Sequence, residues 1–299
     1  MGHTPRTRHT RSAPPTPPAG RRLGWTPGRG FAPADTAPSG GLAAADSWLV
    51  AEGRVRGIGH HRDRFLGACR QEGLADGDLE RFWRDLVAEL PRAGSWFPRA
   101  ELAPDGGLAL LLRTAPELGT GIRVLPWSRP DPRQAPRRKG PDLERLAEVR
   151  AVAVAAGADD ALFTTSDGYV TESTTAGLLW WDGPELVRPD ATDHVLPSVT
   201  SALIERAAHR LGITVRPGRA TPVELYDREV WLVNALHGIR PVTHWAGADR
   251  PAAPAPRAGR WRAVLRGTAE PLPPPPGLRP PRDDRCTDTP EPTRKGIPT

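Results

Sequence analysis

Lysine is almost absent from this chain. Only Lys139 and Lys295 occur among 299 residues, and arginine supplies the rest of the 41 basic side chains. Unlike arginine, lysine can lose its proton and attack a carbonyl as a free amine. Lys139, in the body of the chain, is therefore a candidate Schiff-base lysine, whereas Lys295 lies in a proline-rich end. Composition alone leaves open the alternative of a stray lysine in an arginine-rich protein.

Cysteine is equally scarce, with Cys69 in the body and Cys286 near the end. This excludes a disulfide framework or a Cys-x-x-Cys metal site within the body, and it suits a reducing compartment. No run of about 18 apolar residues is present, so we expect no membrane span. The N-terminus is rich in arginine but has no apolar signal core. We therefore expect a cytoplasmic protein.

Both ends of the chain lack hydrophobic periodicity. Residues 1–41 are rich in Pro and Arg, and residues 251–299 are rich in Pro. Such segments do not bury enough apolar surface to offset the entropy of the chain, and we expect them to be largely disordered.

The positive charge belongs to the N-terminal end. Residues 1–30 contain six arginines and no acidic residue, and the whole chain carries a net charge of +6. The remaining residues are thus neutral overall. A neutral body argues against nucleic-acid binding, although a basic tail of this kind can bind polyanions weakly.

The first half of the body has the pattern of a small α+β domain, residues 42–127. Apolar residues recur at helical spacing after Asp78. Apolar runs flanked by turn residues predict strands; these are residues 46–50, 96–102, 108–113 and 121–127. Residues 128–138 carry the prolines and charges of an interdomain linker.

The second half, residues 139–250, has the pattern of a larger α/β domain. A helix is predicted from Pro141 to Gly157, and another begins after Ser198. Two Asp-Gly pairs between apolar runs predict hairpins, at residues 167–168 and 182–183. Strands are predicted at residues 214–215, 229–233 and 238–242.

Four features in these domains are candidates for a site around Lys139. Glu172 ends a strand among small polar residues, and the helix start at residues 198–200 offers backbone N–H groups to an anion. Arg64 offers a cation, and Asn234, the single asparagine, ends a strand before a loop. Taken singly, each has an ordinary alternative: a solvated carboxylate, a plain N-cap, a surface charge and a turn asparagine. The histidines are too scattered to predict a metal site.

In this order the motifs resemble those of the class IV aminotransferases, the fold-type IV pyridoxal-phosphate enzymes. This family includes branched-chain and D-amino-acid aminotransferases and 4-amino-4-deoxychorismate lyases. The resemblance covers residues 139–245 well and 46–127 loosely. Its motifs are Lys139 to Leu143, Gly157 to Leu162, Asp167 to Glu172, Leu196 to Thr200 and Asn234 to Val242.

The resemblance implies an α+β, two-domain fold of the D-amino-acid aminotransferase type, with pyridoxal 5'-phosphate as cofactor. Lys139 would hold the cofactor and move the substrate proton, and Glu172 would face the pyridine nitrogen. The phosphate would be bound by Val199 and Thr200, with Arg64 beside it. Asn234 and Ala235 would complete the cofactor site. The family also implies a homodimer and a small amino-acid-like substrate.

Three positions depart from the family pattern. Ala235 stands where many of the aminotransferases have a phosphate-binding Ser or Thr, so one contact is missing. Gly177 stands where the family often has asparagine, and Ser198 where it often has glycine. The run from Asn234 to Leu236 is more similar to the lyase branch.

We therefore expect a 4-amino-4-deoxychorismate lyase-like enzyme that releases pyruvate and p-aminobenzoate. An amino-acid transaminase is the alternative within the family. An alternative of another class is a non-catalytic domain whose basic tail binds an anionic partner.

Overall fold

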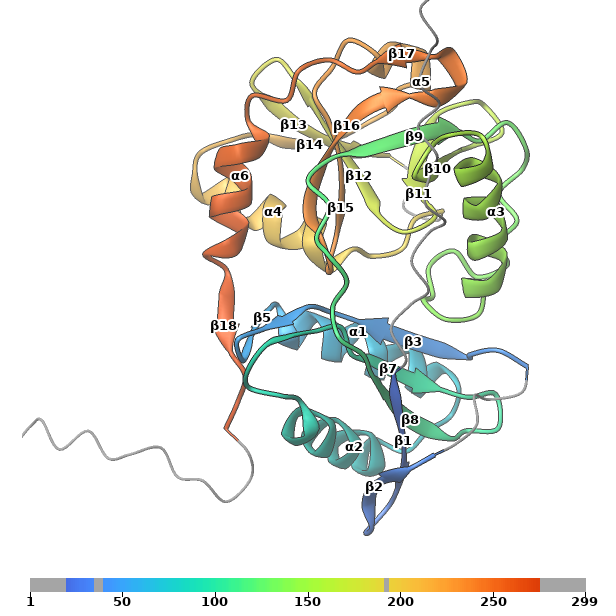
Figure 1. The fold of residues 1–299 in the computed structure, drawn as a ribbon, viewed down its shortest axis with the longest axis vertical. Coiled ribbons are helices and arrows are strands. Elements are labelled where there is room, and N and C mark those ends of the chain that lie inside the picture. The colour runs from blue at the N-terminus through green and yellow to red at the C-terminus, as the bar shows by residue number, and fades with distance from the viewer. Residues whose placement is uncertain (1–19, 35–39, 191–193, 275–299) are drawn as a thin grey trace, which may run out of the picture.

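The structure is a computed structural model, described for residues 20–34, 40–190 and 194–274. It has two domains, a small one at one end of the long axis and a larger one at the other (Figure 1). This two-domain α+β architecture is the one expected from the sequence.

In the described residues, the small domain contains two sheets and two helices. The five-stranded sheet has the order β2-β1-β8-β7-β3, and the four-stranded sheet has the order β18-β5-β4-β6, in which β18 (Ala269–Pro271) comes from the C-terminal part of the chain. Its elements are β1 (Arg21–Thr26), β2 (Gly30–Pro33), β3 (Ala44–Ser47), β4 (Val50–Ala51), β5 (Arg54–Arg56), α1 (Ile58–Gln71), α2 (Asp76–Glu89), β6 (Ser95–Trp96), β7 (Arg99–Leu102) and β8 (Leu108–Leu112).

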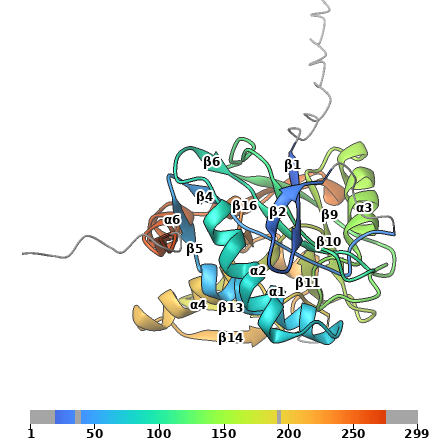
Figure 2. The same cartoon turned by 90° about the horizontal axis from the view of Figure 1, so that it is seen from below.

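Helices α1 and α2 of the small domain contact each other, and α2 lies in front of α1 when viewed from the small-domain end (Figure 2). Helix α2 buries the apolar face that its sequence spacing predicts: Leu79, Phe82, Trp83, Leu86 and Val87. These side chains join one apolar core with Phe65 and Leu66 of α1 and Leu110 of β8.

The prediction that residues 1–41 are disordered is wrong for residues 21–33. Strand β1 pairs with β8 and buries Leu23 and Trp25, and the Trp25 indole donates a hydrogen bond to Asp85 at 3.0 Å. The apolar alternation is too short to stand out in the sequence. Sheet partners distant in the chain supply the contacts that order it. Residues 1–19 lie outside the described residues.

Within the described ranges, the large domain is built on nine strands. Six of them, in the order β11-β10-β9-β16-β15-β12, form a ring that closes where Glu172 of β11 pairs with Gly177 of β12. The strands are β9 (Ile122–Pro126), β10 (Asp160–Thr164), β11 (Val170–Ser173), β12 (Gly177–Asp182), β13 (Glu185–Pro189), β14 (Val215–Gly218), β15 (Val230–Asn234), β16 (Gly238–Trp245) and β17 (Arg250–Pro251).

Helices surround this ring, and apolar side chains fill its interior. The helices are α3 (Leu143–Ala155), α4 (Val199–Arg210), α5 (Pro222–Leu225), the 3₁₀ turn η1 (Ala246–Ala248) and α6 (Ala258–Arg266). One apolar cluster, with Leu178, Leu232 and Val242, joins residues of β9, β10, β12, β15 and β16 inside the ring. A separate cluster packs α4 and α6 on the outer face against Trp231.

The predicted domain boundary after residue 127 is wrong. Strand β9 pairs in parallel with β10 and β16 of the large domain, so the chain leaves the small domain in the segment between β8 and β9. The sequence predicts β9 as a strand, but it does not show which domain's sheet the strand joins, because its partners β10 and β16 are distant in the chain.

The expectation of disorder from residue 251 onward is also wrong for its first part. In α6, Trp261 and Leu265 are buried against the large domain. The chain then returns to the small domain, where β18 (Ala269–Pro271) pairs with β5 and Leu272 enters the small-domain core (Figure 1). Residues 275–299, which include Lys295 and Cys286, lie outside the described residues.

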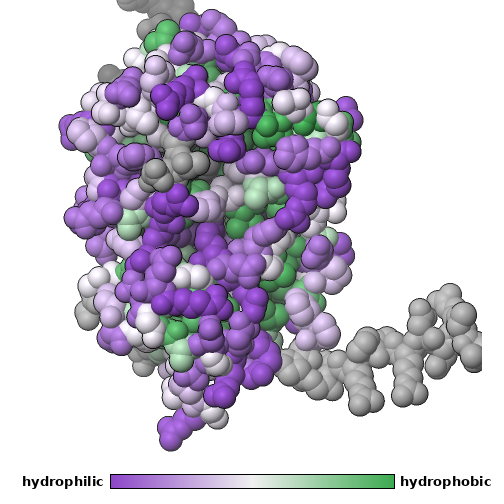
Figure 3. All heavy atoms as spheres, turned by 180° about the vertical axis from the view of Figure 1, so that it is seen from behind, coloured by the Kyte–Doolittle hydropathy of each residue, from purple (hydrophilic) through white to green (hydrophobic). Residues whose placement is uncertain are grey.

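The face opposite to that of Figure 1 is mostly hydrophilic, with hydrophobic residues in small groups between the polar ones (Figure 3). Within the described ranges, no helix is both long and apolar enough to cross a membrane.

The ordering of β1 can be tested at Arg22, which pairs with the fully buried Glu101 at 2.7 Å. Arg22→Met should lower the free energy of unfolding by about 3 kcal/mol, because it removes one of the two arginines, Arg22 and Arg99, that form ion pairs with the buried Glu101 carboxylate. Urea denaturation measures this loss. Arg21→Met is the control: Arg21 is mostly exposed and should change the value by less than about 0.5 kcal/mol. Equal, small changes in both variants would mean that β1 is not docked.

Candidate active site

A cavity of about 330 Å³ lies between the two domains. Its lining includes every side chain that the sequence analysis selected, from segments distant in the chain: Arg64, Lys139, Glu172, Val199, Thr200, Asn234 and Ala235. Its size falls within the usual range for small-molecule sites.

Lys139 is positioned by the backbone on both sides of it. Its carbonyl accepts a hydrogen bond from the Ala45 N–H of β3 at 2.7 Å. The next residue, Gly140, has φ +136°, and a Cβ atom there would lie 2.7 Å from the Ala44 Cα. Only glycine permits this close approach. The chain is thereby fixed against β3 where the lysine enters the cavity.

The electrostatic surroundings lower the pKa of Lys139 below its ordinary value. Burial is the main cause, since it removes water from the ammonium form, and repulsion by the Arg64 guanidinium adds to it. Asp46 and Glu172 act in the opposite direction but do not outweigh burial. A larger fraction of this amine is therefore unprotonated, and able to act as a nucleophile, than for a lysine in water.

Glu172 lies on β11 at the closure of the ring and is 5% exposed. Its carboxylate accepts a hydrogen bond from the Leu196 N–H at 2.8 Å and forms an ion pair with Arg133. Burial raises the pKa of Glu172, and Arg133 opposes that rise.

Arg133 belongs to the segment predicted as a linker, residues 128–138, and sequence reasoning did not select it. Its buried side chain also binds Asp131 and the His194 carbonyl. This part of the predicted linker is thus packed against the site. Prolines and charges indicated a linker, but the pairing of Arg133 depends on a strand 39 residues further along.

Arg64 connects the small domain to the start of α4. Its guanidinium makes two hydrogen bonds to Asp46, at 2.7 and 2.9 Å, and donates to the Pro197 carbonyl at 2.8 Å. Asp46 is fully buried and is also bonded to His61 Nδ1 at 2.8 Å. Although burial alone would raise the pKa of Asp46, Arg64 and His61 hold it well below the ordinary range.

Asp46 and His61 were not selected as site residues. Asp46 was noticed only as the start of a strand, although a lone charge within an apolar run is a usable signal. Its role depends on the hydrogen-bonded ion pair with Arg64, 18 residues away, which only the folded chain brings into contact.

The start of α4 has the geometry of an anion site. Ser198 caps the helix by accepting a hydrogen bond from the Ser201 N–H at 3.2 Å. The first turn of a helix has no internal partners for its N–H groups, and here these include Val199 and Thr200. A Cβ atom at Gly177 would lie 3.3 Å from the Ser198 Cβ. The departures at 177 and 198 therefore accommodate each other, since the missing side chain leaves room for the serine.

Asn234 holds the turn between β15 and β16. Its side chain donates to the Thr175 carbonyl at 3.2 Å and accepts from the His237 N–H at 2.8 Å. Ala235 packs against the small-domain core, and its carbonyl accepts a hydrogen bond from Arg56 at 2.9 Å. Both residues line the cavity, and the turn also joins the two domains.

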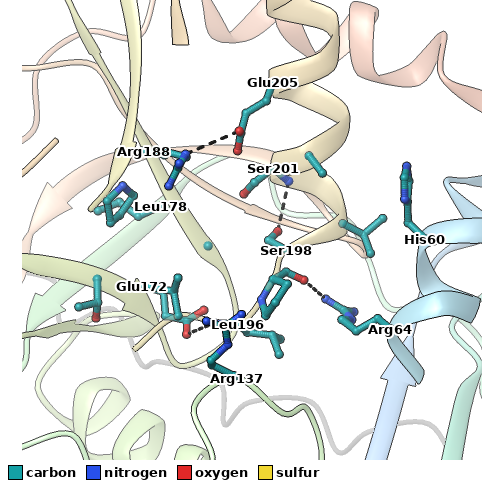
Figure 4. A pocket seen from close by; sticks show the side chains of 17 residues that line it. His60, Arg64, Arg137, Glu172, Leu178, Arg188, Leu196, Ser198, Ser201 and Glu205 are labelled. Carbon is teal, nitrogen blue, oxygen red and sulfur yellow. Dashed lines mark hydrogen bonds and ion pairs between the residues drawn. The ribbon is translucent and has the colours of Figure 1, made fainter. Parts of the chain in front are cut away.

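A second cavity, of about 430 Å³, adjoins the first along the loop before α4 (Figure 4). Both are lined by Arg64, Glu172, Gly177, Leu196, Ser198 and Val199. In Figure 4, the Arg188 and Glu205 side chains point toward each other in the lining of this second cavity, with 3.8 Å between Arg188 Nε and Glu205 Oε2. The loop before α4 therefore lines both cavities.

No group of three metal-ligating side chains lies among the described residues.

The sequence model of the amino-transferase class IV family matches residues 43–245. The chain belongs to this family. The match spans parts of both domains and includes all the cavity residues selected above, from Arg64 to Ala235. No curated protein sequence matches the chain.

Solved structures share the fold at low sequence identity. An aminotransferase from Brucella abortus, bound to the cofactor PLP, is 17% identical with a TM-score of 0.68, and the match covers 83% of this chain and 98% of that one. A branched-chain amino acid aminotransferase from T.th. is 21% identical with a TM-score of 0.68, covering 83% and 93%. A putative 4-amino-4-deoxychorismate lyase from Legionella pneumophila is 20% identical with a TM-score of 0.64, covering 79% and 96%.

The lowered pKa of Lys139 predicts a shift in its chemical reactivity. In a Lys295→Ala variant, Lys139 is the single lysine, so labelling with acetic anhydride at a series of pH values reports on its amine. Half-maximal labelling should occur at a pH below the ordinary lysine value near 10.5, because burial favours the neutral form. Mass spectrometry of the peptide measures it. The same protein in urea is the control and should titrate at the ordinary value. Coincident curves would contradict the buried amine.

Proposed function

We propose that this class IV aminotransferase-family protein is a pyridoxal-phosphate enzyme that uses Lys139 to hold the cofactor and to move the substrate proton. One observation carries the proposal. Lys139, Glu172 and the start of α4 line a single cavity, although they come from separate segments of the chain. These are the three kinds of group that the cofactor requires: an amine, an acid and an anion site.

The residues present fit the cofactor phosphate. Val199 and Thr200 would bind it through N–H groups at the positive end of the helix dipole. Arg64 would add a cation, because its guanidinium already contacts the Pro197 carbonyl directly before the helix. Ala235 adds no hydroxyl, so the Asn234 turn would contribute through its backbone and its position.

When bound, pyridoxal phosphate supplies an aldehyde for amines and a ring that accepts the electron pair left by proton removal. Lys139 would hold the cofactor through its amine, and the lowered pKa of Lys139 favours the neutral form of the amine that this requires. The same amine, when free, would take the proton from the substrate Cα. The enclosed cavity between the domains would limit access of water during this step.

Glu172 would face the pyridine nitrogen and hold a proton there. A carboxylate is required for this, and the ion pair with Arg133 favours the ionised form of Glu172, opposing the rise in its pKa that burial causes. The Leu196 N–H fixes the same carboxylate, which orients it within the cavity.

As the specific activity we propose that of a 4-amino-4-deoxychorismate lyase. Ala235 supports this reading, because the run from Asn234 to Leu236 is similar to the lyase branch and lacks the hydroxyl found in many of the transaminases. A transaminase acting on amino acids is the competing activity. A homodimer and a cytoplasmic location are further parts of the proposal, drawn from the family.

The cofactor assignment predicts a yellow absorption band when the full chain is mixed with pyridoxal phosphate. Borohydride reduction should then fix the cofactor covalently to the peptide that contains Lys139. Lys139→Ala should show neither the band nor the covalent product, because the amine is missing. Visible spectroscopy and peptide mass spectrometry measure both.

Lys295→Ala is the matched control, since it also removes one of the two lysines. It should keep the band and the covalent product. A band that survives Lys139→Ala, or that is lost in Lys295→Ala, would refute the assignment of Lys139.

The lyase activity predicts that p-aminobenzoate and pyruvate appear together from 4-amino-4-deoxychorismate without an added keto acid. A transaminase would instead need a keto acid as the amino acceptor and would form a new amino acid. Chromatography of the products, with and without 2-oxoglutarate, distinguishes the two. Strict dependence on the keto acid would overturn the lyase proposal and leave the cofactor assignment intact.

A further inference from the structure

A buried arginine without a partner lines the active-site cavity. Arg240 is 7% exposed, and its Nε has no hydrogen-bond partner. Within the described part of the chain it forms neither an ion pair nor a side-chain hydrogen bond. It was not selected from the sequence, where it is one of many arginines.

The sheet places Arg240 on the inner face of the six-stranded ring. It is two residues from Val242 on β16 and pairs with Leu232 of β15, and both of these belong to the apolar cluster inside the ring. Arg240 is therefore a charged side chain at the end of an apolar interior, where that interior opens into the cavity.

The acidic residues near Arg240 are bonded to other groups. Asp160 attracts it electrostatically, but its carboxylate accepts hydrogen bonds from Ser173, Thr174 and Thr175. Asp159 is bound by Arg123. Neither carboxylate forms a hydrogen bond or an ion pair with Arg240.

Such an arrangement is costly in a protein without a ligand. Burial of a cation without a hydrogen-bonded anion is unfavourable by several kcal/mol, which is why buried charges are normally paired. An anionic ligand in the cavity would supply the missing partner, through the charge-assisted hydrogen bonds that a guanidinium makes to a carboxylate.

A second cation faces the same cavity from the small domain. Arg113 also has an Nε without a partner, and its guanidinium lies over the Phe97 ring at 5.0 Å. Its neighbour Arg99 is already paired with Glu101. The cavity thus offers one unpaired arginine from each domain, which suits a ligand with two anionic groups.

We propose that Arg240 binds a second carboxylate of the substrate and makes the enzyme selective for dicarboxylic substrates. This proposal rests on the assignment of the Lys139 cavity as the active site. The two carboxylates belong either to an aliphatic chain or to a ring-bearing acid, and Arg113 is positioned to bind the other one.

The test compares acids that differ by one carboxylate, with the cofactor-loaded full chain and isothermal titration calorimetry. Glutarate and pentanoate form the aliphatic pair, and isophthalate and benzoate form the aromatic pair. In at least one pair the diacid should bind about ten- to a hundredfold more tightly, the size of one hydrogen bond to a charged group. The pair that shows the preference identifies the type of substrate.

Arg240→Met should abolish this preference and leave the binding of the monoacids unchanged. Arg150→Met is the matched control, because Arg150 also lines the cavity but is exposed and donates to the Asp159 carbonyl. It should keep most of the preference. The melting temperature of Arg240→Met should not fall, since Arg240 has no protein partner to lose.

Three results would overturn the proposal. These are the absence of any preference for diacids in the native protein, an equal loss of preference in both variants, and a loss of cofactor from Arg240→Met with diacid binding unchanged. The last would mean that Arg240 binds the cofactor phosphate. Repeating the titration without cofactor separates this proposal from the proposed function. A preference that depends on Arg240 would persist even if no yellow band formed.

Discussion

The buried carboxylate of Asp46 is the constraint on which the site depends. It has no contact with water and is compensated by Arg64 and His61, so it fixes helix α1 to strand β3. Arg64 extends the same connection to the Pro197 carbonyl, directly before α4. The neighbouring residue of β3, Ala45, binds the backbone of Lys139. One buried charge thereby positions both the amine and the anion site, which lie in different parts of the chain.

The closed ring of strands provides the second half of this arrangement. Glu172 and Gly177 pair where the ring closes, and Gly177 leaves room for Ser198 at the start of α4. The carboxylate of Glu172 is then held by Leu196 and by Arg133 from the segment that follows β9. The acid, the helix start and this segment are therefore coupled by direct contacts.

The described part of the chain crosses between the domains twice, and both crossings connect the two domains that border the cavity. After β8 it enters the large domain, and after α6 it returns to place β18 on the small-domain sheet. The Asn234 turn adds a contact through Arg56. Two arginines without ion-pair partners, Arg113 from the small domain and Arg240 from the large domain, line the cavity between these connected domains.

The sequence by itself determined the local elements and the site residues carried by motifs. The scarcity of lysine directed attention to Lys139, and the Asp-Gly hairpins and the amphipathic helix α2 follow from short-range patterns. Local patterns also selected Glu172 and the helix start at residues 198–200 as candidates, and the family resemblance supplied their expected roles. Only the tertiary structure decided that β1, α6 and β18 are ordered, that β9 belongs to the large domain, and that Arg133, Asp46 and Arg240 lie in the site. The reason is physical: sheet pairing and ion pairing join residues distant in the chain, and one arginine among many becomes distinctive only when burial removes its water.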